Sequence, residues 1–281
     1  MRFFFLLLAV LLPSLAPSPV RAAAQTAILN GAEISYEVCG DEKAQGVVLV
    51  HDGLANSALW DGVFPLLCKQ YRVVRYDRRG YGKSPPAKDA HAPTDDLYAV
   101  MKLAGLDHAH IIGSSAGAGL AVDFVFDQPE AIDKLVLVSP SISGYQPTPA
   151  LVARLRRIED VVVKGDMDAI VETITTDPYV IWPSNGAARE KLAAILRANP
   201  GDLGAHPRQR RPFNTALRLP EIYAPTLVLV GASDDPYNQA VAASVQQRLR
   251  AAKIQVLPGQ AYLPYLEDPD GFVKIVTAFL Q

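Results

Sequence analysis

The sequence predicts an α/β protein with a mostly parallel central sheet, flanking helices and an inserted helical cap. Short aliphatic runs alternate with amphipathic segments along most of the chain, which is the pattern of this fold class. Three runs, "GVVLVH", "KLVLVS" and "PTLVLVG", are mainly aliphatic, as expected of strands buried on both faces. Residues 141–219 lack such runs and are helical in pattern. We therefore predict a core of residues 25–140 and 220–281, with a cap at 141–219.

The individual strands and helices of the core follow from the same patterns. Runs rich in aliphatic and β-branched residues are predicted as strands: Glu33–Cys39, Gly46–His51, Tyr71–Tyr76, Ala109–Gly113, Lys134–Ser139, Thr226–Gly231 and Lys253–Leu257. Amphipathic segments between them are predicted as helices: Leu59–Lys69, Asp95–Leu103, Ser115–Phe126, Tyr237–Arg250 and Asp268–Leu280. The cap interrupts the alternation between two core strands, so we expect it to cover the carboxyl ends of the strands, where α/β sheets bind ligands.

Residues 1–24 are predicted to be a signal peptide that is removed by cleavage before Gln25. Arg2 precedes an unbroken apolar run, Phe3–Leu12, and Ala22–Ala24 supply the small side chains that a signal peptidase accepts. A membrane-spanning helix is the alternative, but it needs about 20 apolar residues, and this run has ten. We therefore expect a secreted or periplasmic protein with no membrane span in the mature chain.

The composition narrows the class of partner. The net charge is −2 and no basic block is present, so the chain carries no electrostatic signature of nucleic-acid binding. Five histidines and two cysteines occur without the CxxC or HExxH spacing of metal sites. We expect no metal and no cofactor, and a small molecule as substrate or ligand.

The segment "IIGSSAGAG" contains the candidate nucleophile, Ser115. A predicted strand ends at Gly113, and a Gly-x-Ser-x-Gly turn leads directly into a predicted helix. Such a turn forces its central serine into strained geometry and exposes the hydroxyl above the sheet. The alternative is a serine that only caps the helix in a glycine-rich loop. The strand before it and the helix after it favour the nucleophile.

A second loop, in "VLVHDGLANSALW", follows another buried strand and is the candidate oxyanion hole. The amides of Gly53 and Ala116 are expected to point toward the same place beside the nucleophile, where they would stabilise the charge that develops in acyl transfer. His51, at the strand end, is interpreted as structural. A carboxylate at Asp52 would oppose a developing oxyanion if it faces inward, and would not if it points to solvent.

The chain resembles the α/β-hydrolase-fold family, of the lid-bearing type that includes esterases, lactonases, dehalogenases, epoxide hydrolases and carbon–carbon bond hydrolases. The resemblance covers nearly all of the mature chain, because "HDG", "DRRGYGKS", "GSSAG", "PTLVLVGASDDP" and "LPYLEDPDGF" follow one another in the family's order. It implies the fold and a small-molecule hydrolase. A serine rather than an aspartate at position 115 argues against dehalogenase and epoxide hydrolase chemistry.

The resemblance also implies the remaining members of a catalytic triad. The acid is expected at Asp234, with Asp235 as the second candidate, although either could instead cap the following helix. The chain departs from the family at two positions: the tail "GQAYLPYLEDP" has Tyr262 where the family has its histidine, and Asp52 stands where the family commonly has glycine. A phenol with a pKa of about 10 does not take a serine proton at neutral pH as an imidazole does.

Other histidines are candidate replacements for the missing base. His108 and His110 lie at the start of the strand that leads to the nucleophile, at its far end, and His91 lies in a polar loop. His206, in the cap, could reach the site from above. Three functions stay open: a serine hydrolase of small esters or lactones with a weakened base, a non-catalytic relative that binds a small hydrophobic ligand, and a lyase or isomerase using Ser115 and Tyr262.

Two further features remain open at this stage. The cap contains four large apolar or aromatic residues, Tyr179, Ile181, Trp182 and Phe213. They either line an apolar pocket or pack within the cap itself. Cys39 ends one predicted strand, and Cys68 lies just before another that is expected to be its antiparallel neighbour. One interpretation is a disulfide that closes a loop of about 30 residues. Two small buried thiols are the alternative.

Overall fold

A computed structural model describes residues 24–204 and 214–281 and contains one eight-stranded sheet. The strand order is β1-β2-β4-β3-β5-β6-β7-β8, and only β2 runs antiparallel to its neighbours. The predicted mostly parallel α/β fold is therefore confirmed. The strands are β1 Gln25–Leu29, β2 Ala32–Cys39, β3 Gly46–Val50, β4 Arg72–Tyr76, β5 Ala109–Ser114, β6 Ile132–Val138, β7 Thr226–Gly231 and β8 Ala252–Leu257.

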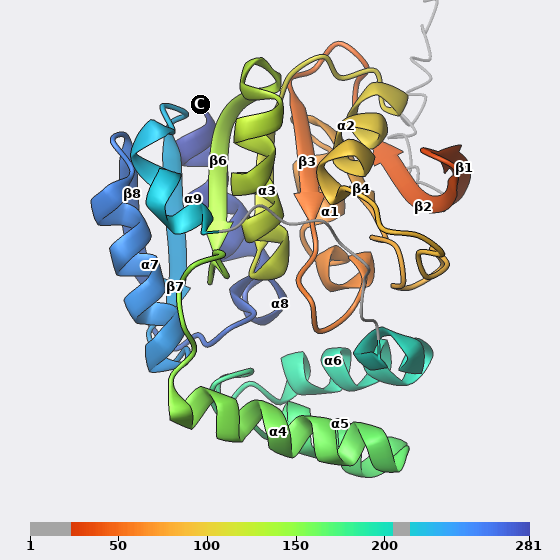
Figure 1. The fold of residues 1–281 in the computed structure, drawn as a ribbon, viewed down its shortest axis with the longest axis vertical. Coiled ribbons are helices and arrows are strands. Elements are labelled where there is room, and N and C mark those ends of the chain that lie inside the picture. Colours follow the sequence, from red (N-terminus) through yellow and green to blue (C-terminus); the bar gives the residue numbers. More distant parts are fainter. Residues whose placement is uncertain (1–23, 205–213) are drawn as a thin grey trace, which may run out of the picture.

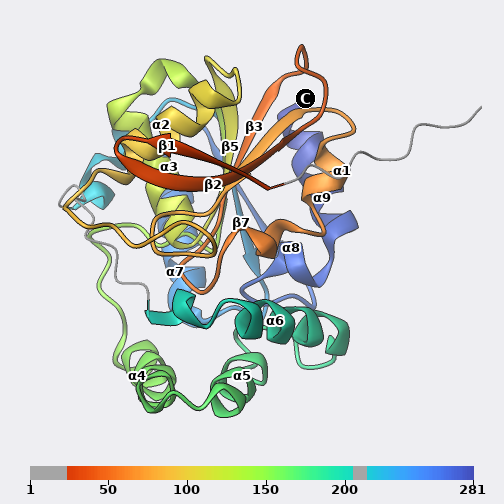
Figure 2. The same ribbon diagram turned by 90° about the vertical axis from the view of Figure 1, so that its right-hand side faces the viewer.

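Helices cover both faces of the sheet (Figures 1 and 2). On one face α2, α3 and α7 enclose one hydrophobic cluster, and on the other α1 and α9 enclose a second cluster, which continues into the cap. The inward side chains of the central strands are fully buried, which explains their continuous aliphatic sequence. The core helices are α1 Phe64–Leu67, α2 Pro93–Leu103, α3 Ala116–Asp127, α7 Pro236–Arg248, α8 Pro264–Glu267 and α9 Pro269–Leu280.

Two core elements differ from the prediction. β1 was not predicted; it pairs with β2 through a two-residue hairpin turn in which Asn30 and Gly31 both have positive φ, 49° and 73°. An Asn-Gly turn is a strong hairpin signal. The helix predicted at Leu59–Lys69 is wrong in length, because the structure has a 3-10 turn, Ser57–Trp60, and the single helical turn of α1. Gly62 and Pro65 interrupt the predicted helix.

Between β6 and β7 the chain forms a helical layer at the carboxyl ends of the strands (Figure 1). Asp202 holds this layer to the core, since its carboxylate accepts hydrogen bonds from Asn56 Nδ2 and the Gly82 amide, both at 2.7 Å. In the described residues, no helix has the length and apolar character needed to cross a membrane. The elements of the layer are α4 Pro149–Lys164, α5 Met167–Thr175, α6 Gly186–Ala198 and the 3-10 segments Pro200–Gly204 and Thr215–Glu221.

A disulfide joins Cys39 to Cys68, with the two Cα atoms 5.5 Å apart. Cys39 ends β2, which is the antiparallel neighbour of β4, and Cys68 lies just before β4. The neighbouring strands bring the two residues to one end of the sheet. Of the two alternatives left open by the sequence, the structure contains the bond.

Candidate active site

Ser115 lies at the sharp turn between β5 and α3, with φ 47° and ψ −108°. A non-glycine residue with positive φ is uncommon and is held there by its surroundings. The Ser115 amide donates to Val138 O at 2.8 Å, and Ser115 O accepts from the amides of Gly119 and Ser141. The neighbouring strand and the first turn of α3 therefore fix the backbone that carries the hydroxyl.

The glycines around Ser115 permit the close packing of this turn. A methyl group on Gly117 would lie 2.3 Å from Val50 O and 2.5 Å from His51 O, and one on Gly113 would lie 2.5 Å from Gly117 O. No side chain fits at those distances. The Gly-x-Ser-x-Gly spacing is therefore required by the approach of α3 to β3 and β5.

The candidate oxyanion loop follows β3 and lies against the start of α3. A methyl group on Gly53 would be in ordinary contact, 3.7 Å, with the Cβ atom of Ala116. Tyr81 supports this loop, because its hydroxyl donates to Gly53 O at 3.4 Å. The two residues whose amides were predicted to form the oxyanion hole are thus brought together.

His51 is fully buried, and both of its ring nitrogens have partners. Nε2 accepts from the Arg78 amide at 2.9 Å, so Nδ1 carries the proton and donates to Asp52 O at 2.8 Å. Burial, and then the charge of Arg78, hold the pKa of His51 well below its ordinary value. This ring is a neutral structural element, and "YDRRGYGKS" supplies the groups that hold it.

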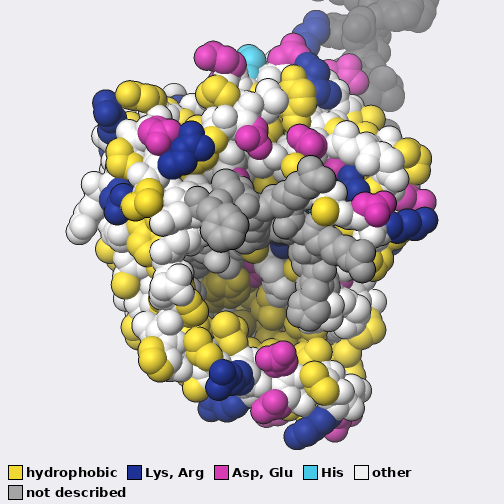
Figure 3. All heavy atoms as spheres, viewed as in Figure 1, with side chains coloured by type: hydrophobic (Ala, Val, Ile, Leu, Met, Phe, Trp, Pro, Cys, Tyr) yellow, Lys and Arg dark blue, Asp and Glu magenta, His cyan; other side chains and the backbone are white. Residues whose placement is uncertain are grey.

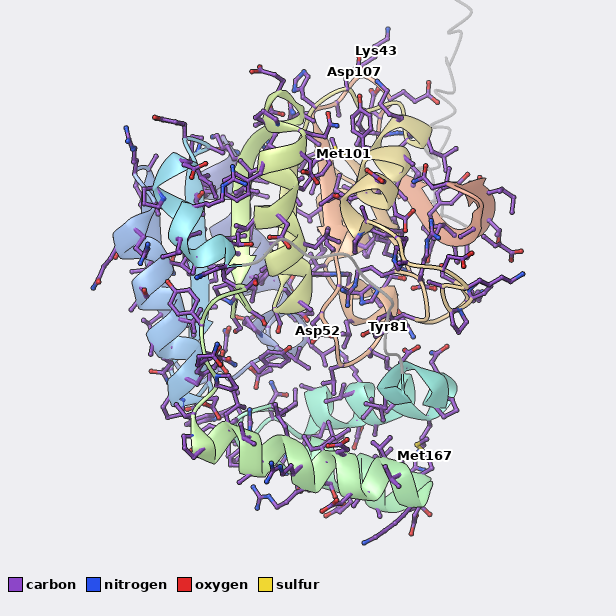
Figure 4. The ribbon with its side chains drawn as sticks, in the orientation of Figure 1. Lys43, Asp52, Tyr81, Met101, Asp107 and Met167 are labelled. Atoms are coloured by element: carbon purple, nitrogen blue, oxygen red, sulfur yellow. A yellow bond between two sulfur atoms is a disulfide. The ribbon has the colours of Figure 1, made fainter. Side chains whose placement is uncertain are left out.

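Asp52 is fully buried, and its side chain lies next to Tyr262. Its Oδ1 accepts from the amides of Leu54 and Ala55, at 2.8 and 3.2 Å. Its Oδ2 has no hydrogen-bond partner of standard geometry among the described residues. Burial raises the pKa of Asp52 from 3.8 to about 6. Figure 4 places Asp52 and Tyr81 at the end of the sheet that faces the cap.

Asp234, directly after β7, is buried and strongly hydrogen-bonded. Its Oδ2 accepts from Ser139 Oγ at 2.6 Å, and its Oδ1 accepts from the Asp235 amide and Asn238 Nδ2. Burial raises the pKa of Asp234 to about 6. Asp235 is instead the N-cap of α7, where its side chain accepts from the Tyr237 amide, so the capping alternative describes this residue.

Tyr262 lies beside both Ser115 and Asp52. Burial and the charge of Asp52 raise its pKa well above the ordinary 10, and its hydroxyl interacts with the side chains of Ser115 and Asp52. Asp234 acts on the Tyr262 hydroxyl only through its charge. The three residues predicted to converge therefore lie close together, and the phenol also lies next to Asp52.

The other described histidines lie away from this arrangement. His108 bonds to Asp133, and both His108 and His110 stand at the amino end of β5, opposite Ser115. His91 lies 4.0 Å from a carboxylate oxygen of Asp96 in α2. His206 lies outside the described residues. No group of three or more metal-ligating side chains gathers in residues 24–204 and 214–281.

The cap is tied to the tail that carries Tyr262. The Tyr262 amide donates to Tyr179 O at 3.1 Å, and Glu267 accepts from the amides of Trp182 and Ala261. Ile181 packs in the cluster shared by cap and core, while Phe213 lies outside the described residues. Figure 3 shows a hollow between core and cap in which hydrophobic side chains gather.

Sequence reasoning missed three contributors to the site. Ser139, in a positive-φ conformation at the end of β6, holds Asp234. Arg78 donates to Asp52 O at 2.5 Å and fixes the oxyanion loop. Tyr265 stacks on Trp60 with ring centroids 4.0 Å apart and donates to Ser114 Oγ. Only Ser139 carried a signal, since it ends a buried strand next to the two site strands.

A family model described as "Alpha/beta hydrolase family" matches residues 47–275. A protein of Caulobacter vibrioides (strain NA1000 / CB15N) whose name proposes a carbamate hydrolase, RutD, is 26% identical and covers 88% of this chain and 95% of its own. The 3-oxoadipate enol-lactonase 1 of Acinetobacter baylyi is 24% identical, over 90% of this chain and 94% of its own.

A solved structure shows the same fold. The esterase from Rhodococcus sp. ECU1013 superposes with a TM-score of 0.77 at 21% identity, over 92% of this chain and 98% of that chain. The match of the family model extends from β3 into α9 and so includes the turn at Ser115, the strand before Asp234 and the tail that carries Tyr262. The chain belongs to the alpha/beta hydrolase family.

Proposed function

We propose that this protein is a serine hydrolase that cleaves a small apolar ester or lactone, with Ser115 as nucleophile and a non-standard base. The carrying observation is the backbone of Ser115, whose φ of 47° lies in a turn at a strand end, beside the contacting residues Gly53 and Ala116. Acyl transfer needs a nucleophile and oxyanion donors at one point. Hydrophobic side chains in the hollow between core and cap (Figure 3) support an apolar substrate.

The kind of relative found also supports acyl chemistry. The names of the two relatives refer to a carbamate hydrolase and an enol-lactonase, and both names describe cleavage at a carbonyl carbon. A serine nucleophile forms an acyl intermediate in such reactions. Asp234 and Tyr262 complete the arrangement in our proposal, Asp234 as the buried acid and Tyr262 in the place of the imidazole.

A fluorophosphonate probe tests this proposal without knowledge of the substrate. The purified protein should be labelled at Ser115, and Ser115→Ala should abolish labelling. Ser114→Ala is the matched control, since Ser114 is the adjacent, fully buried serine whose hydroxyl accepts from Tyr265. Hydrolysis of p-nitrophenyl acetate and butyrate should follow the same pattern. Absence of both labelling and hydrolysis in the folded protein would rule out a serine hydrolase.

The second candidate is a non-catalytic relative that binds a small hydrophobic ligand. The observation that favours it is Tyr262, because a phenol whose pKa is raised by burial is a poor replacement for imidazole. This candidate predicts no labelling of Ser115 together with saturable binding of an apolar fluorescent probe that acyl esters displace.

Export is part of the proposal. Residues 1–23 lie outside the described residues, and β1 begins at Gln25, immediately after the predicted cleavage site. The Cys39–Cys68 disulfide is a bond of the kind that persists in oxidising compartments. Amino-terminal sequencing of the protein recovered from periplasm and medium tests this, with Gln25 as the expected first residue. A protein that keeps Arg2 in the cytoplasmic fraction would contradict it.

A further inference from the structure

Asp52 is a buried carboxylate with one oxygen unused. Oδ1 accepts from the Leu54 and Ala55 amides, while Oδ2 lacks a partner of standard geometry among the described residues. A buried unpaired polar atom costs stability. The groups that surround Asp52 therefore determine what Oδ2 can do.

Charged and titratable groups from three elements face Asp52. Arg78 reaches it from the loop after β4, Tyr262 and Tyr265 from the tail, and His51 precedes it on the chain. Arg78 and His51 both bind the Asp52 backbone carbonyl and leave Oδ2 free. The Tyr265 hydroxyl is committed to Ser114. The Tyr262 hydroxyl, which also interacts with Ser115, remains as the group next to the carboxylate.

We propose that Asp52 is the proton acceptor for Ser115, with the hydroxyl of Tyr262 as the relay between them. This inference rests on the proposed serine hydrolase function. The contact between Asp52 and Tyr262 is not a short, aligned hydrogen bond here, and catalytic hydrogen bonds often tighten only when substrate is bound. The relay gives a function to both residues that depart from the family, Asp52 and Tyr262.

The proton transfers balance through both half-reactions. As Ser115 Oγ bonds to the acyl carbon, its proton moves to the Tyr262 oxygen and the phenol proton moves to Asp52 Oδ2. The carbonyl electron pair moves to the oxygen, which the Gly53 and Ala116 amides bind. When that pair returns, the ester C–O bond breaks and the alcohol leaves with the proton returned along the same route. Water then repeats the sequence on the acyl-enzyme.

The relay also removes the electrostatic conflict at the oxyanion hole. Asp52 is adjacent in the chain to the donor Gly53, so its negative charge would oppose a second one at that point. Protonation of Asp52 neutralises the carboxylate in the same step that forms the oxyanion. An acceptor of pKa about 6 is mostly ionised at neutral pH and close enough to that pH to return the proton.

Stopped-flow acylation by p-nitrophenyl acetate, and the rate of fluorophosphonate labelling, test the relay. Asp52→Asn keeps the acceptor for the Leu54 and Ala55 amides and removes the proton acceptor. It should lower the acylation rate about 10²-fold or more and abolish the rise of rate through about pH 6. Because Asp234 has the same pKa of about 6, Asp234→Asn is measured too and should keep that inflection.

Tyr262→Phe should slow acylation as much as Asp52→Asn does. Tyr145→Phe is the matched control, since Tyr145 is a half-buried tyrosine after β6 whose hydroxyl bonds Ser244 in α7, and it should leave acylation within about 3-fold of the wild type. The double variant Asp52→Asn/Tyr262→Phe should be no slower than either single variant, because a relay broken once transfers no proton.

Rescue separates proton transfer from structure. Tyr262→His supplies an imidazole, so acylation should increase and Asp52→Asn should then have little effect. If Asp52→Asn leaves wild-type acylation and its pH profile unchanged, or if only His206→Ala removes activity, the relay is wrong while the serine hydrolase stands. If the wild type is neither labelled nor acylated, the proposed function itself fails, and the relay with it.

Discussion

Asp52→Asn should make the folded protein more stable at neutral pH without changing its stability in acid. The buried carboxylate has a pKa of about 6, against 3.8 for its ordinary value. A pKa raised in the folded state means that stability is fully present below the ordinary pKa and is lost as pH rises through the folded one. The wild type should therefore lose stability between about pH 4 and pH 6, and the variant should not lose this contribution.

The shift sets the magnitude. About 2 pKa units correspond to about 3 kcal/mol of unfolding free energy at 1.36 kcal/mol per unit. Because Asp234 titrates in both proteins, its contribution cancels in the difference. Urea unfolding at about pH 3.5, 5 and 8 gives the two stabilities; the variant should gain roughly 3 kcal/mol relative to wild type between the lowest and highest pH.

Asp168→Asn controls for the loss of one negative charge, because its side chain is 87% exposed. It should leave the pH dependence of stability close to that of the wild type. A difference between Asp52→Asn and wild type that does not change with pH would refute the reasoning, since it would mean that the carboxylate is not forced to give up solvation on folding.

The remaining predictions concern the scaffold around the site. Cys39→Ser/Cys68→Ser should lower the free energy of unfolding by about 3–4 kcal/mol in denaturant titration, since the bond spans 29 residues; equal stability would show that the bond does not form. Asp202→Ala removes two 2.7 Å hydrogen bonds between cap and core and should lower the free energy of unfolding by about 1–3 kcal/mol. Amide exchange in α6 should become faster; unchanged exchange would mean that Asp202 does not hold the cap to the core. Gly117→Ala should lower the stability measured by thermal unfolding by at least about 3 kcal/mol, because the added methyl group would lie 2.3 Å from Val50 O. Gly186→Ala, where no atom lies within 4 Å of the added methyl group, should be close to neutral.

The buried central strands could be predicted from the sequence because each is a continuous aliphatic run. "GVVLVH" and "PTLVLVG" are apolar because helices cover both faces of β3 and β7. The first strand was missed although its signal was present, since Asn30-Gly31 forms the two-residue turn that the dipeptide favours. The predicted helix Leu59–Lys69 has apolar residues at helical spacing, but Gly62 and Pro65 interrupt it, and the structure has two short turns there instead.

Side-chain placement at the site was predictable only in part. The turn at Ser115 has a local cause, the glycines on either side. The position of Tyr262 next to Asp52 depends instead on how the tail packs against the loop after β3. These residues are 210 positions apart in the chain, and no spacing rule in the sequence predicts that they meet. Ser139 and Arg78 were missed for the same reason, because their partners come from other strands.

Asp52 is better explained by chemistry than by its role in the turn. The loop needs an oxygen at this position to accept the Leu54 and Ala55 amides. Elsewhere in this chain asparagine meets that need, since Asn56 accepts from the Ala58 amide and Asn185 from the Ala188 amide. An asparagine at position 52 would do the same without burying a charge. The carboxylate differs from it in the second oxygen, which can accept a proton, and among the described residues that oxygen has no hydrogen-bond partner of standard geometry. Burial of a charge at this position costs free energy that an asparagine would not. A role of Asp52 as acceptor of the Ser115 proton explains why a carboxylate stands there.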